Sequence, residues 1–166
     1  MVPVVSIVGK SGTGKTALIG RLIVEFHRRG YRVAAVKHSP EGIDIDHPGK
    51  DSWSFAKAGS DAVIISSSDK IVLIRNVDHD YYIEEITPLI EGEFDVVLAE
   101  GFKKSNAPKI EVFRRDLGDE LLCPVSILSA VATDDSLDIN NVPQLPLSNT
   151  VAIADFIERN FIGGKE

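Results

Sequence analysis

The residues with the clearest chemical potential lie in one glycine-rich segment near the start of the chain. The spacing G-x-x-x-x-G-K-[ST] is met by Gly9, Gly14, Lys15 and Thr16. Glycines there allow backbone N–H groups to converge on phosphate oxygens, and the N-terminus of a following helix adds roughly half a positive charge. In this pattern the lysine reaches the β- and γ-phosphates of a nucleotide, and the hydroxyl ligates Mg²⁺. We therefore predict a phosphate-binding loop.

The nucleotide is expected to contact the whole loop and the first residue after it. The predicted binding residues are Gly9, Ser11, Gly12, Thr13, Gly14, Lys15, Thr16 and Ala17. Lys10 adds a second lysine to the same loop. We predict a catalytic role for Lys10, with a simple contribution to the local positive potential as the alternative.

A carboxylate is expected beside this loop, at the end of a neighbouring strand. The apolar run FDVVLAEGF, residues 94–102, contains Glu100 near its end. Because ligands of open parallel sheets bind at the carboxyl ends of strands, Glu100 is a candidate catalytic residue and Mg²⁺ ligand, acting directly or through a bound water. A solvated glutamate at a strand end is the alternative.

A long polar loop over residues 39–52 supplies a third candidate metal ligand. Its prolines and glycines break any regular element, and loops of this length are often functional. Asp46 is predicted to join the coordination of Mg²⁺, with a solvated carboxylate as the alternative.

Selectivity for guanine needs a carboxylate that accepts hydrogen bonds from N1–H and from the exocyclic amine. Adenine lacks both donors and would leave the carboxylate unpaired, at a cost of roughly 1–3 kcal/mol or more. The chain has no N-K-x-D motif, but SAVATDD, residues 129–135, follows an apolar run. Asp134, or Asp135, is predicted to take the place of that motif's aspartate as the base contact; both could equally be turn residues.

Basic residues gather shortly after residue 100 in a chain that is acidic as a whole. They are Lys103, Lys104, Lys109, Arg114 and Arg115. They predict a local basic patch that attracts a phosphate-bearing ligand or an acidic face of a partner, with an ordinary solvated loop as the alternative.

The elements that must position these residues follow from hydrophobic periodicity. Residues 4–8 are typical of a buried strand, residues 16–29 have helical spacing, and residues 31–38 form a second strand. This βαβ unit predicts a parallel sheet. Further strands are expected at 94–102, 108–115 and 124–131, and helices at 51–59, 81–90 and 149–161.

One segment breaks the parallel pattern. Residues 61–76 contain two β-rich runs around a Ser/Asp/Lys turn, which predicts an antiparallel hairpin and a sheet that is mixed at one side. The predicted fold is α/β, a P-loop NTPase three-layer sandwich with a mostly parallel sheet and an antiparallel hairpin. The length of 166 residues fits a single nucleotide-binding domain over residues 1–166.

Composition narrows the classes of function. The formal net charge of −7 weighs against nonspecific nucleic-acid binding. No apolar run approaches the roughly 20 residues that span a bilayer. The single cysteine, Cys123, fits a reducing compartment, and the N-terminal segment lacks the pattern of a signal peptide. We expect a cytoplasmic protein without nucleic-acid or membrane partners.

Three segments resemble a known group of proteins. K-S-G-T-G-K-T, residues 10–16, resembles the deviant phosphate loop K-G-G-x-G-K-[ST], although Ser11 stands where that pattern has glycine. In several NTPases with that loop the first lysine crosses a dimer interface to the partner's nucleotide. D-x-D-H-P-G-K-D-S, residues 44–52, and E-G-F-K, residues 100–103, are similar to segments of the MobB family, the molybdopterin-guanine dinucleotide biosynthesis adaptor proteins. The resemblance covers most of residues 4–133.

The resemblance implies a homodimer that binds GTP and Mg²⁺ and assists the guanylyltransferase that joins GMP to molybdopterin. Molybdopterin itself is a further candidate ligand. Hydrolysis is expected to be slow, near the unassisted scale of about 10⁻⁴ s⁻¹, because no water-orienting glutamine or arginine finger is identifiable.

Two other classes fit a phosphate loop on this fold. A small-molecule kinase should carry an arginine-rich lid, and the chain has no such cluster beyond Arg114 and Arg115. A metal-insertion GTPase for nickel typically uses His- and Cys-rich ligands, and this chain has four histidines and one cysteine.

Overall fold

The computed structural model describes residues 2–90 and 92–163, and the chain divides into two compact units. One unit takes the chain up to His38 and from Tyr82 onward, and the other is Ser39–Tyr81. The expectation of one nucleotide-binding domain over residues 1–166 stays a prediction.

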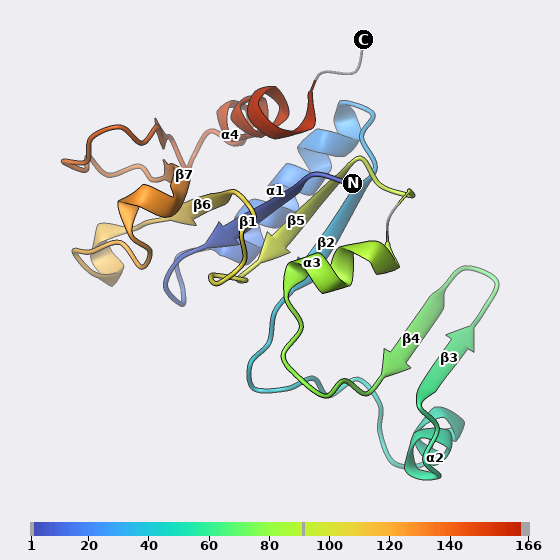
Figure 1. Cartoon of the computed structure of the whole chain (residues 1–166). Coiled ribbons are helices and arrows are strands. Elements are labelled where there is room, and N and C mark those ends of the chain that lie inside the picture. Colours follow the sequence, from blue (N-terminus) through green and yellow to red (C-terminus); the bar gives the residue numbers. More distant parts are fainter. Residues whose placement is uncertain (1, 91, 164–166) are drawn as a thin grey trace. The chain divides into compact units, whose positions relative to one another are not determined.

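The first unit is built on a six-stranded sheet in the order β2-β5-β1-β6-β7-β8, in which every neighbouring pair is parallel. Its strands are β1 (Val4–Val8), β2 (Val33–Lys37), β5 (Val96–Glu100), β6 (Lys109–Val112), β7 (Leu128–Ala132) and β8 (Gln144–Leu145). In Figure 1 the arrowheads of β1, β5 and β6 point toward the same side. The carboxyl ends of the strands therefore share one edge, as the sequence predicts.

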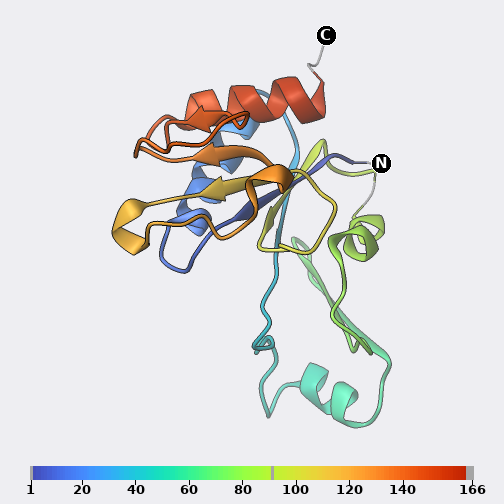
Figure 2. The same ribbon diagram turned by 60° about the vertical axis from the view of Figure 1, so that its left-hand side comes forward.

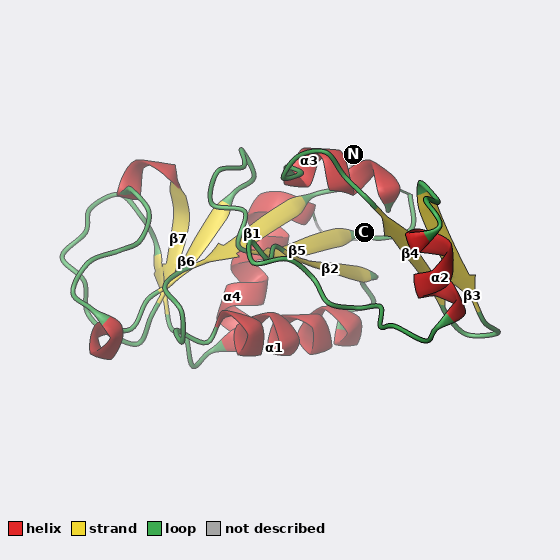
Figure 3. Cartoon of the chain, turned by 90° about the horizontal axis from the view of Figure 1, so that it is seen from below, coloured by secondary structure: helices red, strands yellow, loops and turns green. Residues whose placement is uncertain are grey.

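Helices and loops cover both faces of this sheet. Helices α1 (Lys15–Arg28) and α4 (Thr150–Ile157) lie on one face, and α3 (Ile83–Ile86) lies on the other, as Figure 3 shows. The α1–α4 side holds the largest apolar cluster, to which β1 contributes Val5 and Ile7. The predicted three-layer sandwich is confirmed.

The local sequence explains how α1 packs on the sheet and how its end is joined to the C-terminal segment. The spacing of Leu18, Leu22 and Phe26 places three fully buried side chains on the face that meets the sheet. Arg29, just after α1, contacts Glu25 Oε1 at 2.8 Å and Glu158 Oε2 at 2.5 Å. These ion pairs join the end of α1 to the C-terminal segment and are themselves only partly exposed.

The second unit contains α2 (Asp51–Lys57), β3 (Ala62–Ser66) and β4 (Ile71–Arg75). The hairpin is antiparallel as predicted, with Ile64 opposite Leu73. The expectation that it makes the main sheet mixed at one side is wrong, because β3 and β4 form a separate two-stranded sheet. Residue periodicity predicts that two strands pair, but it carries no information about which sheet they join.

The remaining differences concern element ends and short elements that the sequence analysis did not predict, β8 among them. The helix expected at 81–90 is α3 followed by a 3₁₀ helix at Thr87–Leu89, which begins just before Pro88. The C-terminal helix continues beyond α4 as a π-helical turn at Glu158–Ile162, and short 3₁₀ helices lie at Arg115–Leu117 and Val125–Ile127. None of the helices described has the length and apolar character that crossing a bilayer requires.

Candidate functional site

The phosphate loop between β1 and α1 depends on glycine at its first position. Gly9 has φ 142°, and a Cβ there would lie 2.5 Å from the carbonyl oxygen of Val112 on β6. Gly12 and Gly14 also have positive φ, at 80° and 95°. The loop can therefore approach β6 closely only because residue 9 lacks a side chain.

The carbonyl oxygen of Lys10 is the centre of the loop's internal hydrogen bonds. It accepts from Lys15 Nζ at 2.8 Å and from Thr13 Oγ1 at 3.0 Å. Partial burial lowers the pKa of Lys15, opposed by the nearby Glu100 carboxylate and reinforced by Lys103 and Lys37. The Lys15 ammonium is thus held over the loop, with Lys37 and Lys103 nearby, where it can contact a phosphate.

Thr16 and Glu100 meet across the edge of the sheet. Thr16 Oγ1 donates to Glu100 Oε2 at 2.8 Å, and Lys37 Nζ lies 3.9 Å from Glu100 Oε1. The pairing of Ile7 and Lys37 with Glu100 in the parallel ladders explains this meeting. The structure therefore brings together the two first-unit residues that the sequence proposes as Mg²⁺ ligands.

The chain turns sharply after Glu100. Gly101 and Phe102 have φ of 92° and 53°, and a positive φ is rare for a bulky residue such as phenylalanine. Phe102 is buried with Ile83 and Ala99, which offsets the backbone strain. This packing fixes the direction in which the strand end presents Glu100.

The side chain of Lys10 lies against the turn that follows β6. A Cβ on Gly118, which has φ 135°, would lie 2.5 Å from Lys10 Nζ. Figure 2 shows the phosphate loop and the short helix Arg115–Leu117 at the same end of the sheet. The catalytic role of Lys10, in its own chain or across a dimer, stays a prediction.

The two aspartates after β7 have different partners. Asp134 Oδ1 accepts from the backbone N–H and the hydroxyl of Ser148, at 3.0 and 2.9 Å. Asp135 Oδ2 accepts from the backbone N–H of Arg115 at 2.9 Å. Asp135 therefore ties the β7 end to the turn after β6, whereas Asp134 ties it to the turn before α4.

Asp46 lies in the second unit, where its Oδ1 accepts from Ser52 Oγ at 3.0 Å. Its proposed place in Mg²⁺ coordination stays a prediction. Among residues 2–90 and 92–163, no three His, Cys, Asp or Glu side chains form a group that could hold a metal ion. Thr16 and Glu100 are therefore the two candidate metal ligands that the first unit supplies.

The basic patch expected after residue 100 is smaller than predicted. Lys109 is 4% exposed, and its ammonium donates to the carbonyls of Ser105 and Ala107. Its inclusion in a surface patch is wrong, because the ammonium is buried against the carbonyls of the preceding loop instead of facing solvent. Lys103 and Lys104 remain exposed.

Two charged residues of this region have roles that the sequence analysis missed. Glu111, 1% exposed, accepts from the backbone N–H groups of Leu122 and Cys123. Arg114 Nε donates to the carbonyl of Thr13 at 3.0 Å and so stabilises the phosphate loop. Alternating charge and apolar residues in "KIEVFR" were the available signal, since a charge inside a buried strand needs a specific partner.

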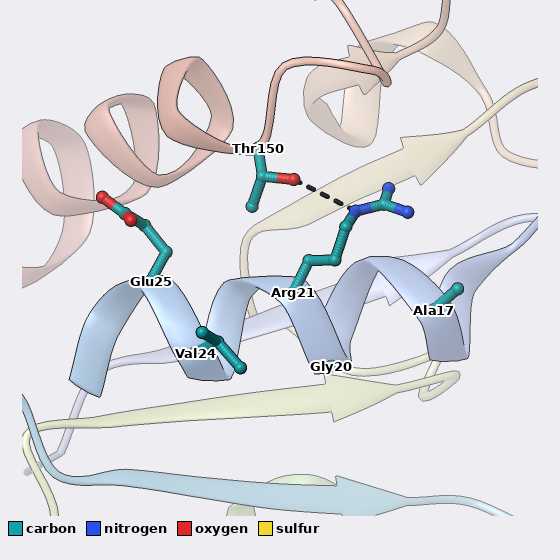
Figure 4. Close-up of a pocket in the computed structure, with 6 residues that line it drawn as sticks. All are labelled: Ala17, Gly20, Arg21, Val24, Glu25 and Thr150. Atoms are coloured by element: carbon teal, nitrogen blue, oxygen red, sulfur yellow. Dashed lines mark hydrogen bonds between the residues drawn. The ribbon is translucent and has the colours of Figure 1, made fainter. Parts of the chain in front are cut away.

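An open hollow of about 470 Å³ runs along α1 toward α4 and is drawn in Figure 4. Its lining residues are Ala17, Gly20, Arg21, Val24, Glu25 and Thr150. Arg21 crosses it to donate to Thr150 Oγ1 at 3.1 Å. Of the predicted nucleotide contacts, only Ala17 is among these lining residues.

Comparisons with known proteins agree on one family. The family model described as molybdopterin guanine dinucleotide synthesis protein B matches residues 4–134. A relative from Haemophilus influenzae, named molybdopterin-guanine dinucleotide biosynthesis adapter protein, is 36% identical over 95% of this chain and 88% of its own. A relative of the same name from Escherichia coli is 32% identical over 95% and 92%.

Solved structures give the same result. The crystal structure of a molybdopterin-guanine biosynthesis protein B (MobB) has a TM-score of 0.71 at 29% identity, and covers 93% of this chain and 97% of that one. A Bacillus subtilis MobB structure, at 22% identity, has a TM-score of 0.73 over 98% and 99% and supports the fold. With a family model over residues 4–134 and relatives above 30% identity along most of its length, the chain belongs to the MobB family.

Proposed function

We propose that this chain binds GTP with Mg²⁺ and serves as an accessory protein in the biosynthesis of the molybdenum cofactor. The observation that carries the proposal is the meeting of Lys15, Thr16 and Glu100 at the carboxyl ends of β1 and β5. A lysine, a hydroxyl and a carboxylate in this arrangement can bind the phosphates and the metal ion of a nucleoside triphosphate.

The donor atoms fit Mg²⁺. The Thr16 hydroxyl and the Glu100 carboxylate are hard oxygen ligands, and they already lie within 2.8 Å of each other. Thr16 and Glu100 would hold the ion, which would supply positive charge to neutralise the phosphates. Lys15 would give up the Lys10 carbonyl and contact the β- and γ-phosphates.

The accessory role draws on the relatives, which are named adapter proteins of molybdopterin-guanine dinucleotide biosynthesis. We propose that the chain assists the guanylyltransferase of that route in the cytoplasm, with molybdopterin as a candidate ligand near the exposed Lys103 and Lys104. Slow turnover, near the unassisted scale of about 10⁻⁴ s⁻¹, fits an adapter better than a catalyst.

A homodimer is the proposed assembly, and the second unit supports it. One face of the β3–β4 hairpin carries Ile64, Ile71 and Leu73, which are 67%, 75% and 51% exposed. An isolated two-stranded sheet with an apolar face gains stability by packing against another surface. A second copy of the chain would bury this face.

Calorimetry tests the nucleotide proposal. GTP with Mg²⁺ should bind the wild-type protein, and Lys15→Ala should abolish measurable binding because the phosphate contact is lost. Lys70→Ala, an exposed lysine of the hairpin turn, is the matched control and should bind as the wild type does. Unchanged GTP affinity in Lys15→Ala would refute the proposed site.

Light scattering tests the assembly. Ile64→Lys together with Leu73→Lys should convert a dimer to a monomer, since two charges would be buried in the interface. Ser68→Lys adds one lysine charge in the exposed turn, away from the apolar face, and should leave the dimer intact. A monomeric wild-type protein would contradict the homodimer.

A further inference from the structure

Asp134 and Ser148 join two segments that leave the same edge of the sheet. Asp134 follows the end of β7, and Ser148 lies in the turn between β8 and α4. The backbone N–H and the hydroxyl of Ser148 both donate to Asp134 Oδ1. The two bonds orient the carboxylate, and neither of them uses Oδ2.

The turn that carries Ser148 is itself held in place. On one side Arg21 Nη2 donates to the carbonyl of Leu147 at 3.3 Å, and Arg21 Nε donates to Thr150 Oγ1. Asn149 Oδ1 accepts from the N–H of Ala152 at 3.1 Å and caps α4. Ser148 lies between these anchors, so its hydroxyl has a defined position relative to α1.

Arg114 connects this region to the phosphate loop. Its Nε donates to the carbonyl of Thr13 at 3.0 Å. Hydrogen bonds from Ser148 lower the pKa of Asp134 against the effect of burial, and the positive charge of Arg114 lowers it further. The carboxylate is therefore ionised at neutral pH and can only accept hydrogen bonds.

We propose that Asp134 reads the guanine base and that Ser148 is the positioning residue that orients its carboxylate. This inference rests on the proposed function. Guanine offers N1–H and its exocyclic amine to the carboxylate, whereas adenine offers neither donor there. Asp134 is exposed, whereas Asp135 is less exposed and its Oδ2 accepts from the backbone N–H of Arg115.

One nucleotide could contact both the glycine-rich loop and Asp134. A ligand with phosphates on the glycine-rich loop and its base at Asp134 would pass near Arg114, because Arg114 Nε donates to the Thr13 carbonyl and its charge acts on Asp134. A planar guanidinium is a suitable surface for a base to stack on.

Calorimetry with GTP, XTP, ATP and inorganic triphosphate tests the proposal in the full-length protein. Xanthine carries a carbonyl where guanine has its amine, so an amide side chain can donate to that oxygen and accept from N1–H. Asp134→Asn should therefore lower GTP affinity about tenfold or more and raise XTP affinity by a similar factor. Asp138→Asn, the same change elsewhere in this loop, should keep the wild-type preference.

Ser148 variants separate positioning from folding. Ser148→Ala should lower GTP affinity about fivefold, because the carboxylate loses one of its two orienting bonds, while inorganic triphosphate binds as before. Ser148→Thr retains a hydroxyl and should restore GTP affinity. A merely structural role would lower the affinity for every ligand alike and would overturn the positioning assignment.

The failure of this inference can be told apart from the failure of the proposed function. A wild-type protein that binds GTP and ATP equally, or a GTP-to-XTP preference unchanged by Asp134→Asn, overturns base reading and leaves the phosphate site standing. Wild-type protein that binds neither nucleotide nor triphosphate overturns both.

Discussion

Replacing Gly9 by alanine is a sharp test of the phosphate-loop geometry. The new Cβ would lie 2.5 Å from the Val112 carbonyl oxygen and 3.1 Å from Thr13 Oγ1. The Val112 contact is with backbone, so a side-chain rotation cannot relieve it. In addition, φ of 142° is unfavourable for any L-residue with a Cβ.

The backbone strain and the close contact with Val112 together set the expected loss of stability. Strain at a sparsely populated φ costs about 1–3 kcal/mol, and forcing an atom into a filled space costs about 1–3 kcal/mol more. Gly9→Ala should therefore lower the free energy of unfolding by about 2–6 kcal/mol. Gly12 has φ 80° but only an ordinary 3.6 Å contact with Leu117 Cδ1, so Gly12→Ala should cost about 1–2 kcal/mol.

Urea denaturation followed by circular dichroism measures these differences. The control is Gly20→Ala in the middle of α1, where a Cβ meets nothing within 4 Å. That change should stabilise the protein by about 0.5–1 kcal/mol, because alanine is the better helix former. Gly9→Ala with a stability within 1 kcal/mol of the wild type would refute the close approach of the loop to β6.

Three further predictions concern buried and paired groups. Glu111→Leu should lower the free energy of unfolding, measured in urea, by about 2–5 kcal/mol, because two N–H groups lose their acceptor. If Glu120→Leu, a change at an exposed glutamate, lowers the free energy of unfolding equally, the prediction is contradicted. Ser6 Oγ is buried without a hydrogen-bond partner in the described part of the chain, so Ser6→Ala should raise the free energy of unfolding by about 1 kcal/mol. A fall in the free energy of unfolding by about 1 kcal/mol or more would instead indicate that the hydroxyl has a partner. Hydrogen bonds from Arg28 and Arg29 lower the pKa of Glu25 to about 2, so its stabilisation is complete above the ordinary value of 4.5 and is lost as pH falls toward 2. The gap in melting temperature between the wild type and Glu25→Gln should narrow over that window, and a constant gap would exclude the pairing.

The sequence predicts the fold and the phosphate end of the site because both are local. A buried strand, a glycine-rich turn and an amphipathic helix follow one another within residues 4–28 and need no distant partner. Glu100 is predictable for a related reason, since parallel strands bring their carboxyl ends to one edge whatever their order.

Contacts between segments distant in the chain could not be predicted. The burial of Glu111 depends on N–H groups at 122 and 123, and no spacing rule links that loop to β6. Ser148 escaped notice for the same reason. Its significance comes from facing Asp134 across a separation of fourteen residues.

The hydrogen bond from Lys15 to the Lys10 carbonyl has a consequence for the heat of ligand binding. A free lysine side chain gives up as much as about 2 kcal/mol of rotamer entropy when it is ordered. In this protein the loop orders Lys15 during folding, so a nucleotide meets an ammonium that is already fixed at 2.8 Å from an oxygen. Binding then exchanges one oxygen partner for another, which reduces both its enthalpic gain and its entropic cost.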